Sequence, residues 1–266
     1  MLRDITLGQY YPTDSYIHRL DPRTKITGTF IYMISVFLIR DIWGYIAAFL
    51  FLAFMIRGSH VPVKFMVRGL KGIFIILIFT ALFNVFFTPG EVLYSLWKLD
   101  ITREGIKVAV RMVIRLVFLI MGSSVMTLTT TPNNLTDGLE RLFRPLKRFK
   151  LPVHEIAMMM SIALGFIPIL VDELDKIMKA QSARGADLEN GKLSTRIRTL
   201  IPILVPLFVS AFRHAGDLAT AMEARCYHGG EGRTRMKPLR YGKQDYSAYT
   251  VIILYLVTVI AIAVML

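Results

Sequence analysis

Cysteine, acidic residues and polar residues in general are all scarce in this sequence. The single cysteine, Cys226, excludes an internal disulfide and a cysteine metal cluster. Asp and Glu number 19 against 32 Lys and Arg, which gives a formal net charge of +13. Because 54% of the 266 residues are hydrophobic and the mean hydropathy is +0.52, a soluble domain could not cover its surface. The composition therefore indicates an integral membrane protein.

Motifs that carry catalysis are missing as well. The sequence has no His-Glu-x-x-His, no Gly-x-Ser-x-Gly and no carboxylate pair within an apolar segment. The stretch Gly185–Leu193 resembles a phosphate-binding P-loop, but five residues separate its glycines where four are required, and Leu193 cannot coordinate magnesium. We therefore predict that this chain is not an enzyme, has no catalytic residue and binds neither a metal ion nor another cofactor.

The excess of basic residues is concentrated at the ends of apolar runs and in the middle of the chain. In a soluble protein this charge would suggest a nucleic-acid partner, but here it is typical of the cytoplasmic side of a bilayer. The predicted partner of these charges is the lipid bilayer, with no nucleic acid. Met1–Asp21 is polar and aromatic, so we expect no cleavable signal peptide, and the first membrane helices would direct insertion.

Five apolar segments are predicted to span the membrane: Ile26–Ile39, Ile42–Ile56, Gly72–Thr88, Ile106–Leu128 and Tyr246–Leu266. The first two are shorter than the roughly 20 residues that cross about 30 Å of hydrocarbon. They would form a tight helical hairpin only if Lys25, Arg40 and Arg57 extend toward the lipid headgroups. Loop cations alternate between high and low counts, which predicts a cytoplasmic N-terminus and an external C-terminus.

The resulting prediction is an all-α, multi-pass protein of the cell membrane. Residues 1–25 form a cytoplasmic juxtamembrane segment, 26–130 hold four membrane helices, 131–245 form a cytoplasmic domain of long helices, and 246–266 are the last membrane helix. Within the third segment, Asn134–Phe149 is amphipathic and should lie along the membrane, kinked or split at Pro145. Two longer helices follow, from Val153 to about Leu188 and from about Leu193 to Tyr227.

The two long helices share a design. Each has an apolar half, an Ile-Pro-Ile-Leu tetrapeptide (Ile167–Leu170 and Ile201–Leu204), a polar half and an Ala-Arg tip. The tips are Ala183-Arg184-Gly185 and Ala224-Arg225-Cys226. An arginine offers a planar, permanently charged fork that binds carboxylates in a partner's groove. The alternative is a cation that neutralises the end of a helix dipole, with Gly185 as the cap residue. The two interpretations are compatible.

Three other groups of residues each leave two interpretations open. Met158, Met159, Met160 and Ala163 form a soft apolar surface that suits changing partners, or they pack within the helical layer. Arg111 and Arg115 either anchor their span by reaching the headgroups or serve a substrate or partner. His18 with Asp14 and Asp21 could suggest metal ligands, but a folded plug that caps the first helix fits the neighbouring cations better.

The N-terminal run Gly8–Lys25, followed by the two Ala-Arg tips, resembles the transmembrane T component of energy-coupling factor transporters, which are ABC-type importers of vitamins and trace metals. The resemblance covers essentially the whole chain and departs at Cys226, where the family signature has glycine. It implies a non-catalytic coupling subunit whose tips dock into two cytoplasmic ATPase subunits, expected to be a heterodimer that holds ATP and magnesium.

The resemblance also implies a membrane-embedded S component, or several interchangeable ones, that binds the substrate. Its expected contacts are Met158, Met159, Met160 and Ala163, with Leu139, Leu142 and Phe143 of the amphipathic helix. The alternative function is a self-contained secondary transporter or channel. That function needs ionisable groups near the bilayer midplane, which the predicted spans almost lack apart from Arg111 and Arg115. A membrane enzyme is a third alternative, without a catalytic constellation to support it.

Overall fold

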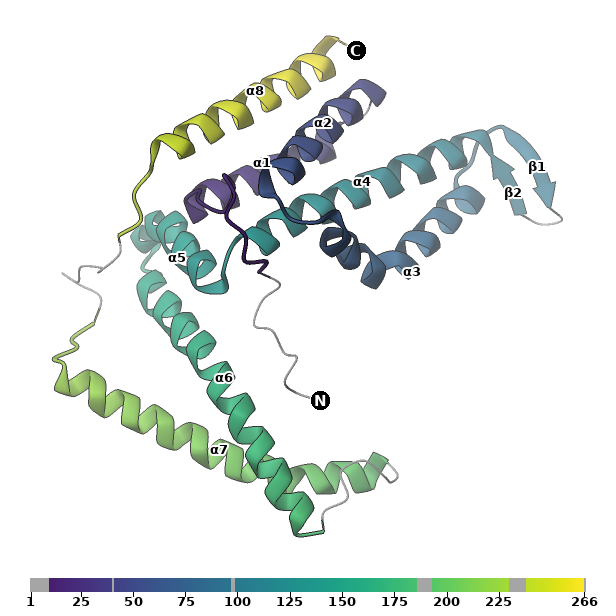
Figure 1. Ribbon diagram of the computed structural model, residues 1–266. Helices are drawn as coiled ribbons and strands as arrows, with labels where there is room; N and C mark the ends of the chain where they lie inside the picture. Colours follow the sequence, from purple (N-terminus) through teal and green to yellow (C-terminus); the bar gives the residue numbers. More distant parts are fainter. Residues whose placement is uncertain (1–9, 40, 97–98, 186–192, 230–237, 266) are drawn as a thin grey trace. The chain divides into compact units, whose positions relative to one another are not determined.

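The computed structural model describes residues 10–39, 41–96, 99–185, 193–229 and 238–265. Most of them are helical, and with several helices long and apolar enough to cross a membrane this confirms the all-α, multi-pass class (Figure 1). The elements in chain order are α1 (Pro22–Leu38), α2 (Ile42–Ser59), α3 (Val63–Phe87), β1 (Val92–Leu96), β2 (Leu99–Thr102), α4 (Arg103–Thr129), α5 (Pro132–Phe143), the 3-10 helix η1 (Arg144–Phe149), α6 (Val153–Ala183), α7 (Leu193–Ala224) and α8 (Lys243–Met265).

The chain divides into two compact units. The first unit, called the membrane bundle below, comprises residues 8–139 and 239–266 and contains α1 to α4, most of α5, and α8. The second, called the coupling unit, has residues 140–238 as its main part and contains η1, α6 and α7. The two boundaries lie at Leu139/Glu140 and Pro238/Leu239.

In the membrane bundle, α1 and α2 each pack against both α4 and α8, and α3 packs along α4 (Figure 1). The core is rich in aromatic side chains. The Tyr255 ring stacks on Phe51 at 4.2 Å between centroids, and its hydroxyl lies 2.6 Å from the Oγ of Ser35. Gly122 allows α4 to approach Tyr32 closely, because a Cβ there would lie 2.4 Å from that ring. Close packing of α1, α2, α4 and α8 therefore holds the bundle together.

Among the residues that the structure describes, six helices are long and apolar enough to cross a membrane by length and composition: α2, α3, α4, α6, α8 and the Leu200–Ala224 part of α7. Helix α1, with 17 residues, is shorter. The outer faces of these helices expose large apolar side chains, such as Ile75 at 79% and Phe79 at 67%. Such surfaces are stable in lipid rather than in water.

Two cations differ from the sequence prediction. Lys25 does not extend toward the headgroups: it is buried, and its Nζ donates to the carbonyls of His18 and Thr129, at 3.0 and 2.8 Å. Arg115 likewise donates from Nη2 to the carbonyl of Ile39 at 3.0 Å, at the C-terminal end of α1. Both cations therefore bind backbone carbonyls at the ends of helices, and Lys25 also binds one in the segment before α1. Arg40 lies outside the described residues, and Arg57 is exposed in the last turn of α2.

The middle helices are shorter than predicted at their C-terminal ends but begin as expected. The amphipathic segment is split as predicted, since α5 ends at Phe143 and η1 begins at Arg144, next to Pro145. Helix α6 ends at Ala183 rather than near Leu188, because Gly185 takes the left-handed conformation. Residues 186–192, which hold most of the P-loop-like stretch, lie outside the described part of the chain.

Candidate functional site

The first Ala-Arg tip is the C-terminal end of α6. The backbone N–H of Arg184 donates to the carbonyls of Ala180 and Gln181, at 3.2 and 3.1 Å. Gly185 follows with φ +86° and donates to the carbonyl of Ser182 at 3.0 Å. A left-handed residue at this position ends the helix and satisfies its last carbonyls. The arginine therefore occupies the last position before the chain turns away.

The second tip, at the end of α7, has the same geometry with a different residue. Cys226 takes φ +55° and donates to the carbonyl of Glu223 at 2.8 Å, while Tyr227 donates to that of Met222 at 3.0 Å. This pair of hydrogen bonds is a Schellman motif, in which glycine usually occupies the left-handed position. The departure of Cys226 from the glycine of the signature therefore leaves the helix end intact.

Both tips are available to a partner. The six tip residues are all exposed: Ala183, Arg184, Gly185, Ala224, Arg225 and Cys226. Within the part of the chain that the structure describes, neither arginine side chain forms an ion pair. Each guanidinium also lies at the negative end of a helix dipole, which fits the capping interpretation, while docking to a partner stays a prediction.

Polar contacts fix α6 against α7 in the coupling unit. Glu173 of α6 accepts a hydrogen bond from the Oγ of Ser210 and lies 3.6 Å from Nε2 of His214. Phe166 stacks on the His214 ring with 6.1 Å between centroids. Glu173 therefore links α6 to two residues one turn apart on α7.

A second contact lies nearer the first tip. The side-chain amide of Gln181 donates to the carbonyl of Pro202 at 3.2 Å. In a regular helix that carbonyl would bind the N–H four residues later, but residue 206 is proline and has none. Gln181 of α6 thus supplies the missing donor. The Pro202–Pro206 spacing in the sequence identifies the carbonyl that lacks a helical partner, but it does not identify the residue that binds it.

The residues predicted to contact an S component fall in two groups. Met159 and Met160 of α6 are 58% and 44% exposed, Ala163 is exposed, and Met158 is half-buried. Phe143 at the end of α5 is 49% exposed, whereas Leu142 is half-buried. Leu139 is also half-buried and belongs to the membrane bundle. The S-component contact stays a prediction for all seven residues.

Comparison with known proteins identifies the family. A family model described as cobalt transport protein (CbiQ) matches residues 13–236. An energy-coupling factor transporter transmembrane protein of Ruminiclostridium cellulolyticum is 55% identical, over 98% of this chain and 97% of its own. Proteins of the same name from Clostridium kluyveri and Bacillus subtilis are 53% and 44% identical, each over 93% of this chain and 93% and 94% of their own. The chain belongs to this transporter family. It is therefore a transmembrane transport component and not a catalytic subunit.

The N-terminal motif that carries the family resemblance forms a structural lock in this energy-coupling factor protein. Buried Asp245, at the start of α8, accepts hydrogen bonds from the backbone N–H groups of Asp21 and Gly242, both at 2.8 Å. The guanidinium of Arg23 pairs with Asp21 at 2.8 Å and lies 3.9 Å from the centroid of the Tyr241 ring. These contacts join the first turn of α1 to the first turn of α8. Sequence reasoning missed Asp245, which it placed at a domain boundary.

The remaining polar groups of the motif are also used within the protein. Asp14 pairs with Arg19 on the surface, and the Nε2 of His18 lies 3.0 Å from the carbonyl of Tyr11. The hydroxyl of Ser15 lies 2.7 Å from Nδ1 of the same ring. Burial lowers the pKa of His18 below its usual value, which favours the neutral ring. The arrangement is that of a folded plug, as predicted, with its carboxylates paired to arginines or capping helices.

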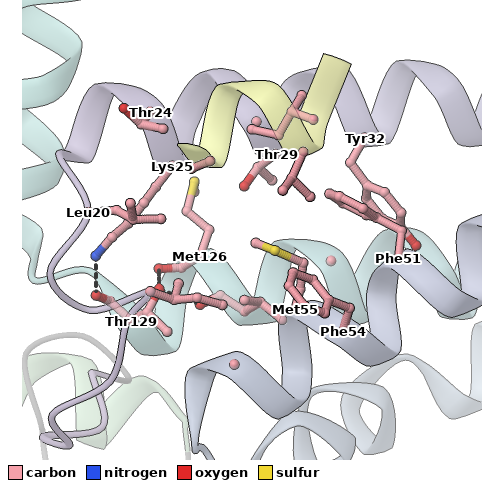
Figure 2. Close-up of a pocket in the computed structure, with 18 of the residues that line it drawn as sticks. Leu20, Thr24, Lys25, Thr29, Tyr32, Phe51, Phe54, Met55, Met126 and Thr129 are labelled. Carbon is pink, nitrogen blue, oxygen red and sulfur yellow. Dashed lines mark hydrogen bonds between the residues drawn. The ribbon is translucent and has the colours of Figure 1, made fainter. Parts of the chain in front are cut away.

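A cavity of about 320 Å³ lies within the membrane bundle of this transport component (Figure 2). Side chains of α1, α2, α4 and α8 line it, and most are apolar, including Tyr32, Phe51 and Met55. Among the described residues of this lining Lys25 is the one charged side chain, and its ammonium group is committed to the carbonyl of Thr129 (Figure 2). None of these described residues offers a carboxylate that could carry a coupling ion.

Proposed function

We propose that this chain is the coupling subunit of an energy-coupling factor importer for a vitamin or trace metal. It would transmit the movement of two cytoplasmic ATPase subunits to a membrane-embedded S component that binds the substrate. The observation that carries this proposal is the matched pair of exposed arginine tips on two long helices fixed to each other. Membership of the transporter family supports it, because such a transporter needs more than its transmembrane component.

A subunit that is moved by separate motors needs stiff elements and firm attachment points. Helices α6 and α7, with 31 and 32 residues, extend about 47 Å each at 1.5 Å per residue. The Glu173 and Gln181 contacts keep them from sliding past each other. An exposed arginine at each end can make two parallel hydrogen bonds to a carboxylate, which a lysine cannot do. The geometry thus supports docking into acidic grooves of the ATPases.

The proposed topology places residues 1–25 and 131–245 in the cytoplasm, with five spans and an external C-terminus. It counts α1 as a span and keeps α6 and α7 in the cytoplasm, although α6 and part of α7 are long and apolar enough to cross a membrane. Cys226 offers a direct test, because it is the single cysteine of the sequence and is exposed beside Arg225. A membrane-impermeant maleimide should label it in inside-out vesicles and not in right-side-out vesicles. Labelling from the external side would contradict this topology.

The docking test uses co-purification with the two ATPases of the transporter. We expect the conservative change Arg184→Lys to weaken ATPase recovery roughly tenfold, since it keeps the charge and loses the bidentate geometry. Arg184→Glu should abolish association through that tip, and the double change with Arg225→Glu should abolish it altogether. Arg213→Glu, on the exposed surface of α7 away from the tip, is the matched control and should leave recovery unchanged.

Full recovery of both ATPases by the Arg184→Glu, Arg225→Glu double variant would refute docking through the tips. Substrate uptake by the purified chain alone in liposomes would refute the coupling function itself and favour a self-contained transporter. ATP-dependent uptake only in the presence of both ATPases and an S component is the result that the proposal predicts.

A further inference from the structure

A long groove runs between α3 and α4 on the membrane bundle, and its two ends differ in chemistry. The groove has a volume of about 780 Å³. One end is lined by three cations of α3, Lys64, Arg68 and Lys71. The rest is lined by apolar side chains of both helices, among them Phe74, Leu77, Ile78, Ala81, Val113 and Val117.

The three cations share one face of α3 and have little to bind within the protein. Their spacing of four and three residues places them along a single stripe of the helix. All three are exposed, and with the residues that the structure describes they form no hydrogen bond or ion pair. Arg68 rests 5.4 Å from the centroid of the Phe65 ring. No carboxylate is among the described residues that line the groove, so their charge at this end is uniformly positive.

The length of the groove matches one lipid leaflet. At 1.5 Å per residue, the cations from Lys64 to Lys71 extend over about 10 Å, and the apolar part from Lys71 to Ala81 over about 15 Å. The latter is half of the roughly 30 Å hydrocarbon core. The charged end would therefore lie at headgroup depth when the apolar end lies near the bilayer midplane.

We propose that this groove binds one anionic phospholipid, with its phosphate at Lys64, Arg68 and Lys71 and an acyl chain along the apolar part. Basic pockets between membrane helices recognise acidic lipid headgroups through charge, and the apolar lining accepts a chain. Three unpaired cations favour an anionic headgroup over a zwitterionic one, whose own positive group they would repel. The inference needs only that α3 and α4 span the membrane, and it is independent of ATPase docking.

The test compares dioleoylphosphatidylglycerol with dioleoylphosphatidylcholine, titrated into the purified full-length protein in non-ionic detergent and read by native mass spectrometry. We expect one phosphatidylglycerol per chain, bound about tenfold more tightly than phosphatidylcholine, since each surface cation contributes up to roughly fivefold. The Lys64→Gln, Arg68→Gln, Lys71→Gln variant should reduce this preference to within about twofold. The thermal midpoint should rise with phosphatidylglycerol in the wild type and not in this triple variant.

Two further variants separate the groove from general surface charge. Ala81→Phe leaves every charge in place and fills the apolar end, so it should weaken binding of both lipids severalfold. The Lys176→Gln, Lys179→Gln, Arg213→Gln variant removes the same charge from exposed positions on α6 and α7 and should bind lipid as the wild type does. Equal binding of the two lipids by the wild type, or unchanged preference in the groove triple variant, would overturn the proposal. So would unchanged binding by Ala81→Phe.

Discussion

Replacing Asp245 by alanine tests whether the lock between the first and last helices of the bundle holds the fold together. The side chain is 4% exposed and accepts hydrogen bonds from two backbone N–H groups, those of Asp21 and Gly242. Asp21 and Asp245 are 224 positions apart in the sequence. Loss of the carboxylate therefore affects the attachment of α8 to α1, through Asp21, and also the first turn of α8, through Gly242.

The expected cost follows from the two donors that lose their partner. An unsatisfied buried N–H costs about 1–3 kcal/mol, and the Asp21 N–H is buried whereas Gly242 is exposed to water, so we expect Asp245→Ala to lower the free energy of unfolding by about 2 kcal/mol. Asp245→Asn keeps one acceptor oxygen and opposes the second N–H with its own amide, so it should cost about half as much. The variants are compared by dodecyl sulfate titration in mixed micelles, followed by circular dichroism, and α8 by amide hydrogen exchange.

Asp14→Ala is the matched control, because it removes a carboxylate of the same N-terminal segment that is exposed and pairs only with Arg19 at the surface. It should unfold like the wild type. The reasoning is refuted if Asp245→Ala is as stable as Asp14→Ala, or if the loss appears without faster exchange in α8. In either case the two N–H groups would have to find other partners.

Two further predictions concern the second tip and the N-terminal plug. Cys226→Gly should relieve the strain of the left-handed conformation, although the greater freedom of glycine in the unfolded chain offsets part of the gain. The Tyr227 amide should then exchange its hydrogen about twofold more slowly than in the wild type. Faster exchange of this amide would contradict the geometry. Since burial lowers the pKa of His18, the folded protein takes up this proton less readily than the unfolded chain. Its thermal midpoint should therefore fall as pH decreases from about 7 to 5, and His18→Asn should reduce that fall.

The helical segments of the bundle could be predicted from hydropathy, but their ends could not. Helix α3 begins at Val63, nine residues before the predicted Gly72, because its first turns are cationic and do not register as an apolar run. The antiparallel pair β1 and β2 occupies part of a stretch treated as a loop. Strands this short carry little periodic signal.

The positions of the two tips could be predicted from the repeated Ala-Arg pattern, whereas the contacts that support them could not. Glu173 and Gln181 look like ordinary polar residues of a charged helix half, and only the packing of α6 on α7 shows what they bind. The contacts of Lys25 and Arg115 could not be predicted from the sequence either. A cation near the end of an apolar run can reach headgroups or helix-end carbonyls, and tertiary structure decides between these.

A proline of α7 explains why the Gln181 contact lies where it does. Proline removes a backbone donor and leaves a carbonyl four residues earlier without its helical partner, so each one weakens the helix locally. At Pro206 the cost is offset by Gln181, which lies only two residues before Ala183 of the first tip. The weak point of α7 is thus held by the end of α6. A force applied to the Arg184 tip would therefore reach α7 next to Pro206, where that helix lacks one of its backbone hydrogen bonds.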